Sequence, residues 1–143
     1  MTDSAPATLL AFDFGRRRIG IAVGQTISAT ASPLQTVEAT RDGAINWAVI
    51  EKLVVEWRPD ALVVGIPSHA DGSEHPLSAR IQRFARQLGG RFALPVHLID
   101  ERLSSHAAEA FAGTTSRHRL DAHAAQIILE TYLAENEQKQ TRG

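Results

Sequence analysis

Two apolar runs, residues 8–14 and 18–24, are separated by only three residues. A connection this short joins antiparallel neighbours, so the chain is expected to begin with a β-hairpin. Gly15 permits the tight turn, because glycine adopts backbone conformations that other residues avoid. A third strand is expected within residues 27–38, where Pro33 marks a sheet edge or a bulge.

After the hairpin, helical and strand patterns alternate along the chain. Residues 61–66 are continuously apolar, which is typical of a strand buried on both faces in a parallel sheet. The remaining pattern predicts helices at 44–57, 76–90, 104–112 and 120–135, a strand at 95–99, a loop at 67–74 and a break at 113–116. This order predicts an α/β fold: a mixed sheet, antiparallel meander then parallel strands, with helices on both faces.

Two of the predicted helices have one apolar face each. In the first, which Pro59 ends, the inward positions are Ile45, Ala48, Val49, Leu53 and Trp57. In the second, the inward positions are Leu77, Ile81, Phe84, Ala85 and Leu88, and the outward ones are Arg80, Arg83, Arg86 and Gln87.

Size and composition limit the class of protein. A chain of 143 residues with 43% apolar residues is expected to form a single domain, 1–143, with flexible ends at about 1–7 and 137–143. It has no cysteine, which excludes disulfides and zinc–thiolate sites, and no signal peptide or membrane span is evident, so a cytoplasmic protein is expected. A net charge of −1 argues against indiscriminate coating of nucleic acid.

Carboxylates stand at the ends of several predicted elements. Asp13 lies on an apolar strand, where a charge is costly unless it is paired or binds a cation. Asp100 and Glu101 follow the run 94–99, and Asp121 precedes the apolar helix that starts at Ala122. Three acids placed in this way suggest a metal-dependent site for phosphoryl transfer.

Five motifs in order resemble the YqgF family of the ribonuclease H-like superfamily, whose members are described as Holliday junction resolvases or precursor 16S ribosomal RNA nucleases. They are Phe12-Asp13-Phe14-Gly15 with Arg18-Ile19-Gly20-Ile21-Ala22, then Val64-Gly65-Ile66-Pro67, Asp71-Gly72-Ser73-Glu74, Asp100-Glu101-Arg102-Leu103-Ser104, and Asp121-Ala122 with Ala124-Ala125. Together they span nearly the whole chain.

The resemblance implies a five-stranded ribonuclease H-like sheet with catalytic acids Asp13, Glu101 and Asp121. These carboxylates suit Mg²⁺ or Mn²⁺, with two ions expected when substrate is bound. Asp13, at the centre, would bridge the ions. Substrate phosphates would be contacted by basic side chains, for which the candidates are Arg16, Arg17, Arg18, Arg102, Arg117 and Arg119.

Each acid also has a structural interpretation. Asp13 could form the turn, and Glu101 could pair with Arg102 or Arg18. Asp121 could be an N-cap or first-turn acid of its helix. Asp100 could support the site or point away from it, and His69 and His75 have no assigned role.

The resemblance supplies the expected substrate, structured RNA, with cleavage at the 5′ end of precursor 16S ribosomal RNA and ribosomal particles as partners. The alternative is resolution of four-way DNA junctions by the same chemistry. A monomer or weak dimer is expected, with no membrane partner. An inactive nucleic-acid-binding module is a remote alternative. A sugar kinase or ATPase of related fold needs two such domains, which 143 residues cannot supply.

The sequence departs from the family pattern at two places. The stretch before the last-helix acid, 113–119, is shorter and poorer in lysine than is common, which predicts weaker phosphate contact there. An acid often found at the end of the second strand is replaced by Gly24-Gln25, so a fourth carboxylate is not expected.

Overall fold

The computed structural model describes residues 7–15, 17–66, 77–100 and 117–142, with the side chains of the last helix described over 122–135. The predicted helix at 104–112 and the loop at 67–74 therefore lie outside the described residues.

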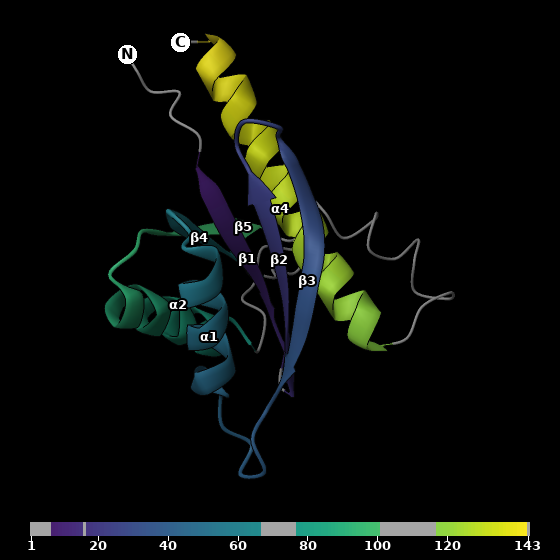
Figure 1. Cartoon of the computed structure of the whole chain (residues 1–143), viewed down its shortest axis with the longest axis vertical. Helices are drawn as coiled ribbons and strands as arrows, with labels where there is room; N and C mark the ends of the chain where they lie inside the picture. Colours follow the sequence, from purple (N-terminus) through teal and green to yellow (C-terminus); the bar gives the residue numbers. More distant parts are fainter. Residues whose placement is uncertain (1–6, 16, 67–76, 101–116, 143) are drawn as a thin grey trace.

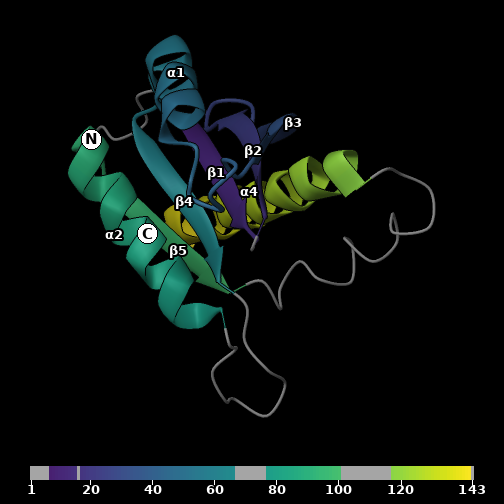
Figure 2. The same ribbon diagram turned by 90° about the horizontal axis from the view of Figure 1, so that it is seen from below.

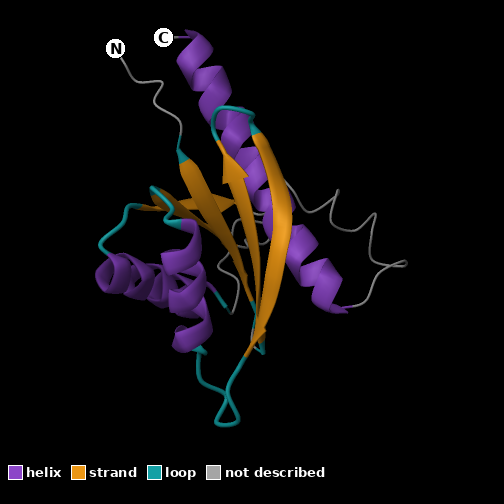
Figure 3. Ribbon diagram, viewed as in Figure 1, coloured by secondary structure: helices purple, strands orange, loops and turns teal. Residues whose placement is uncertain are grey.

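Five strands form one mixed sheet in the order β3-β2-β1-β4-β5 (Figure 3). The strands are β1 (Thr8–Phe14), β2 (Arg18–Gln25), β3 (Thr30–Glu38), β4 (Ala61–Ile66) and β5 (Val96–Asp100). The first three pair as an antiparallel meander, whereas β1–β4 and β4–β5 pair in parallel. The meander followed by parallel strands confirms the predicted sheet.

Helices cover both faces of this sheet. α1 (Trp47–Trp57) and α2 (Ser78–Phe92) lie on one face, and the long α4 (Arg117–Arg142) crosses the other (Figures 1 and 2). The helix α4 packs against β1, β2 and β3. No helix of the described segments is long and apolar enough to cross a membrane.

The side chains of β1 alternate between two cores, one on each face of the sheet. Leu10, Phe12 and Phe14 pack on the α1/α2 side. Leu9 and Ala11 pack on the α4 side, together with Ile128 and Leu129 of the helix, among others. Strand position therefore decides which face each functional side chain occupies.

The strand prediction at Pro33 is confirmed in both of its alternatives. β3 is an edge strand, and the β2–β3 register shifts beside this residue: Ile21 pairs with Gln35, and the next residue, Ala22, pairs with Pro33. Proline lacks the N–H that a continuous ladder needs, so an edge position beside a bulge accommodates it.

The helix boundaries differ from the prediction. α1 starts at Trp47 rather than residue 44, and its fully buried positions are Ile50 and Leu53, whereas Ala48 is exposed. The other predicted inward positions, Ile45, Val49 and Trp57, pack against the core, and the Trp47 ring adds a contact by stacking on Phe84 of α2 with centroids 5.6 Å apart. α2 continues to residue 92, and α4 spans 117–142 instead of 120–135.

Small residues allow α4 to approach the sheet closely. Ala11, Ala22 and Ala31 of the sheet are buried, as are Ala122 and Ala125 of the helix. Gly24 has no room for a side chain, because an added Cβ would lie 2.7 Å from the carbonyl oxygen of Thr30 and 2.8 Å from Cδ2 of Leu129.

We expect Gly24→Ala to lower the free energy of unfolding by about 2 kcal/mol, because overpacking forces the strand or the helix to shift. Gly90→Ala is the matched control, since nothing lies within 4 Å of a Cβ added there. Within a helix, that change is expected to stabilise by about 0.5–1 kcal/mol. Urea unfolding of both variants checks this, and equal effects would contradict it.

Candidate active site

The parallel strands β1, β4 and β5 end at one edge of the sheet, here called the carboxyl edge. In open α/β sheets, ligands bind outside the carboxyl ends of the strands. α4 begins at the same end of the molecule (Figure 1). This edge is therefore where the predicted acids should converge.

Asp13 lies inside β1, one residue before its end at Phe14, and it is half-buried. It is not part of the turn, so its interpretation as a turn-former is wrong. Strand alternation places Asp13 on the α4 side of the sheet with Leu9 and Ala11.

Glycines stand beside Asp13 on both neighbouring strands. Its partner on β2 is Gly20. On the other side, Phe12 pairs with Val64, and the next residue of β4 is Gly65. Neither neighbour contributes a side chain at the level of Asp13. The position of Gly65 beside Asp13 emerges only from the register of β1 against β4.

The fold brings Asp121 to the carboxyl edge through the backbone of α4. The helix starts at Arg117, so Asp121 lies in its second turn, and the first turn has no acid. Its interpretation as an N-cap or first-turn acid is therefore wrong. Asp121 precedes the buried Ala125 by four residues and the buried Ile128 by seven. Asp121 therefore shares the helical register of these two buried residues.

Asp100 is the last residue of β5 and does not share the face of Asp13. Ile99 belongs to the core on the α4 side, whereas Val96 packs on the α1/α2 side. By alternation, Asp100 falls on the α1/α2 side. The sequence left open whether Asp100 supports the site or points away from it. The structure places Asp100 on the opposite face of the sheet from Asp13.

Other predicted residues lie outside the described part of the chain: Glu101, Arg16, Arg102, His69 and His75. The side chains of Asp121, Arg117 and Arg119 are likewise not described. Within the described residues, no three acidic or histidine side chains form a group that could hold a metal ion. The three-acid metal site therefore stays a prediction, and Asp13 is the member whose surroundings the structure shows.

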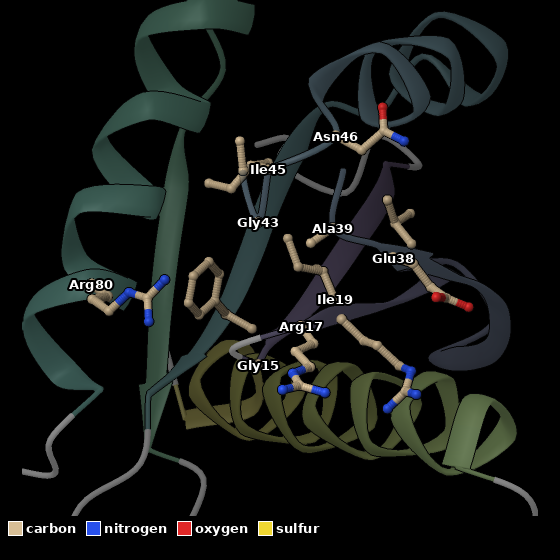
Figure 4. A pocket seen from close by; sticks show the side chains of 13 residues that line it. Gly15, Arg17, Ile19, Glu38, Ala39, Gly43, Ile45, Asn46 and Arg80 are labelled. Carbon is tan, nitrogen blue, oxygen red and sulfur yellow. The ribbon is translucent and has the colours of Figure 1, made fainter. Parts of the chain in front are cut away.

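The β1–β2 turn presents arginines next to this edge. The N–H of Gly15 donates to the carbonyl of Arg18 at 2.8 Å, and a Cβ on Gly15 would come equally close to that oxygen. Only glycine fits such a turn without a shift, as the sequence predicted. Arg17, which is exposed, and Arg18 line a shallow hollow together with Arg80 of α2 (Figure 4).

The fold is that of RuvC-like proteins. A solved structure of Thermus thermophilus RuvC in complex with Holliday junction substrate matches with a TM-score of 0.59, covering 92% of this chain and 96% of that one. A second Thermus thermophilus RuvC structure gives 0.58. At 15% and 14% sequence identity, these likenesses concern the fold alone.

The family follows from the sequence matches. The model of the family described as "RuvX: Holliday junction resolvase" matches residues 7–135, so the chain belongs to the RuvX family. Relatives named "Putative pre-16S rRNA nuclease" are similar over most of their length. The protein from Sodalis glossinidius is 48% identical, covering 91% of this chain and 96% of its own. The Escherichia coli K12 protein is 47% identical, covering 87% and 94%.

Proposed function

We propose that this protein is a metal-dependent nuclease that hydrolyses phosphodiester bonds in structured RNA at the 5′ end of precursor 16S ribosomal RNA. The observation that carries the proposal is Asp13, a half-buried carboxylate at the carboxyl edge with glycines on both neighbouring strands, in a chain of the RuvX family. The names of the relatives from Sodalis glossinidius and Escherichia coli support the RNA substrate.

The proposed metal ligands are Asp13, Glu101 and Asp121. Their carboxylate oxygens match the preference of Mg²⁺ and Mn²⁺ for oxygen donors. Two bound ions would activate a water molecule and stabilise the leaving oxygen. The described strands fit this role, because Gly20 and Gly65, which stand beside Asp13 on β2 and β4, have no side chains to occupy the position next to it.

In the proposed reaction, the oxygen of water forms a bond to phosphorus while the bond to the leaving oxygen breaks. The proton lost by water passes to solvent, and the leaving oxygen takes a proton in turn. Arg17 and Arg18, next to the end of β1, would bind the negatively charged phosphate oxygens.

Cleavage of a four-way DNA junction is the second candidate activity. The description of the RuvX family and the RuvC-like fold favour it specifically. The reaction at Asp13 would be the same for both substrates. Residues other than the three acids would therefore determine whether the protein cleaves RNA or a four-way DNA junction.

The test is cleavage of a 5′-extended 16S precursor RNA beside a four-way DNA junction, each in Mn²⁺ and in EDTA. We expect cleavage of the RNA in Mn²⁺ and only background in EDTA, because carboxylates alone supply no Lewis acid. Cleavage of the junction alone would move the assignment to a resolvase. Binding of the RNA with no cleavage of either substrate would favour the inactive binding module.

A further inference from the structure

α2 has charges of a single sign. Residues 77–99 contain four arginines and no aspartate or glutamate, and all four arginines are exposed on this helix. A helix face that is merely solvated usually mixes both signs, because oppositely charged pairs three or four residues apart stabilise it. The absence of acids suggests that the positive charge of α2 has an external partner.

Three of the four arginines form a row. Arg83 follows Arg80 by three residues, Gln87 follows Arg83 by four, and Arg91 follows Gln87 by four. Residues with these spacings lie along one side of a helix. Arg86 follows Arg83 by three residues but lines a separate hollow, between α2 and β5, and neither of the hollows described next. Arg86 can therefore serve as a control for the three arginines of the row, because it lies on the same helix but outside the row.

The row borders a continuous groove. One hollow is lined by Arg17, Arg18 and Arg80, and an adjoining hollow by Arg80 and Arg83; the two share Phe14, Gly43, Ala44 and Ile45. Figure 4 shows the guanidinium of Arg80 turned toward the first of them. We call the surface formed by Arg17, Arg18, Arg80, Arg83 and Arg91 the arginine groove. Glu38 is the one acid among the described residues that line the two hollows.

Aromatic rings hold two of these side chains. Cζ of Arg80 lies 5.9 Å from the centroid of the Phe14 ring, and Cζ of Arg91 lies 4.2 Å from that of Trp47. Stacking uses the flat face of a guanidinium and leaves the N–H groups at its rim available to phosphate oxygens. Arginines held in this way lose less conformational freedom on binding than free ones.

The row leads away from the proposed catalytic edge. Arg80 lies in the first turn of α2, next to the end of β1, and Arg91 lies in its last turn. Eleven residues of helix separate them, or about 16 Å at 1.5 Å per residue. For a strand stacked as in a helix, with roughly 3.4 Å of rise per phosphate, that distance corresponds to about five nucleotides, and a more extended strand covers it with fewer.

We propose that the arginine groove binds the phosphate backbone of a single-stranded RNA segment that extends from the cleavage position along α2. The proposal rests on the proposed nuclease function for the position of the cleaved bond. A polyanion matches a surface with this charge, and a single row of arginines matches one backbone rather than the two of a duplex. Base identity plays no part, because guanidinium–phosphate contacts are independent of sequence.

The test measures binding in EDTA, so that it does not depend on cleavage. The probes are RNA hairpins with 5′ single-stranded extensions of 0, 2, 4, 6 and 8 nucleotides, plus one hairpin whose extension is base-paired. Wild-type affinity is expected to rise with extension length until about five nucleotides. Arg80→Gln/Arg83→Gln should remove most of that rise, weakening the longest probe about fivefold or more and reducing its salt slope by about 1.4.

Arg83→Gln and Arg86→Gln provide the matched comparison, since each removes one exposed charge from the same helix. Only the first is expected to weaken the extended probes, and thermal melting confirms that both variants fold. Equal losses in both variants, or an unchanged length dependence in the double variant, would overturn the proposal. Equally strong, arginine-dependent binding of the base-paired extension would also overturn it.

The experiments can distinguish a failure of the arginine-groove proposal from a failure of the proposed nuclease function. If wild type cleaves precursor RNA while the double variant binds extended probes normally, the groove proposal fails and the nuclease assignment stands. If wild type cleaves nothing but shows length-dependent binding that Arg80 and Arg83 supply, the groove stands and the nuclease assignment fails.

Discussion

Asp13→Asn is expected to reduce cleavage of precursor RNA by at least about a thousandfold. Asparagine has nearly the same shape, so the fold should persist, but its neutral amide would be a much poorer ligand than a carboxylate for the proposed metal ions. A thousandfold corresponds to about 4 kcal/mol of lost transition-state stabilisation, a plausible share of what two metal ions provide. Single-turnover cleavage in Mn²⁺ measures it.

The matched control is Asp60→Asn, which makes the same chemical change at the other end of β1. There, a carboxylate oxygen of Asp60 accepts a hydrogen bond from the N–H of Thr8 at 2.9 Å. The asparagine side-chain oxygen can accept the same bond, so we expect activity within about twofold of wild type. Residual activity of Asp13→Asn above a few per cent, with the control unchanged, would remove Asp13 from the metal site.

Phe84→Ala is expected to have the largest effect on stability, lowering the free energy of unfolding by about 4 kcal/mol. The Phe84 side chain is 1% exposed, and its ring contacts those of Phe12, Phe14 and Trp47 at centroid distances of 5.0–5.7 Å. Removing it leaves a cavity where β1, α1 and α2 meet. For a domain whose total stability is typically about 5–15 kcal/mol, such a loss is severe.

Val55→Ala is the control, because Val55 is 65% exposed on α1. It removes apolar atoms without opening a cavity, and we expect a change within about 0.5 kcal/mol. Denaturant unfolding of both variants gives the comparison. A cost below about 2 kcal/mol for Phe84→Ala would mean that the surrounding core collapses into the space.

The sheet was predictable because its signals are local. The short connection at Gly15 fixed the antiparallel β1–β2 pair, and the unbroken apolar run 61–66 indicated a strand with both faces buried. Helix limits were harder to predict, since they depend on tertiary contacts. Trp47, the first residue of α1, stacks on Phe84, a residue of a different helix, and such a contact has no local signal in the sequence.

The residues of the candidate site also differ in how well the sequence predicts them, because some have a local signal and others depend on tertiary structure. A charge on an apolar strand made Asp13 recognisable from sequence, whereas the position of Gly65 beside it depends on the register of β1 against β4. The face of Asp100 was ambiguous, because apolar residues occur on both alternations of residues 95–99, with Val96 and Leu98 on one and Ile99 on the other. The arginine row had a readable signal, the spacing of Arg80, Arg83 and Arg91 without acids between them, but only the groove showed its connection to β1.

The packing of α4 at Gly24 affects the position of the helix that carries Asp121, one of the proposed catalytic acids. The acids proposed to share metal ions stand on separate elements, β1 and α4, and α4 also packs against β2, where Cδ2 of Leu129 comes within 2.8 Å of a Cβ added to Gly24. The missing side chain of Gly24 therefore lets α4 lie close to the sheet that carries Asp13. Enlarging Gly24 would tilt or lift the helix that supports Asp121, so a packing change far from any phosphate would alter metal affinity as well as stability.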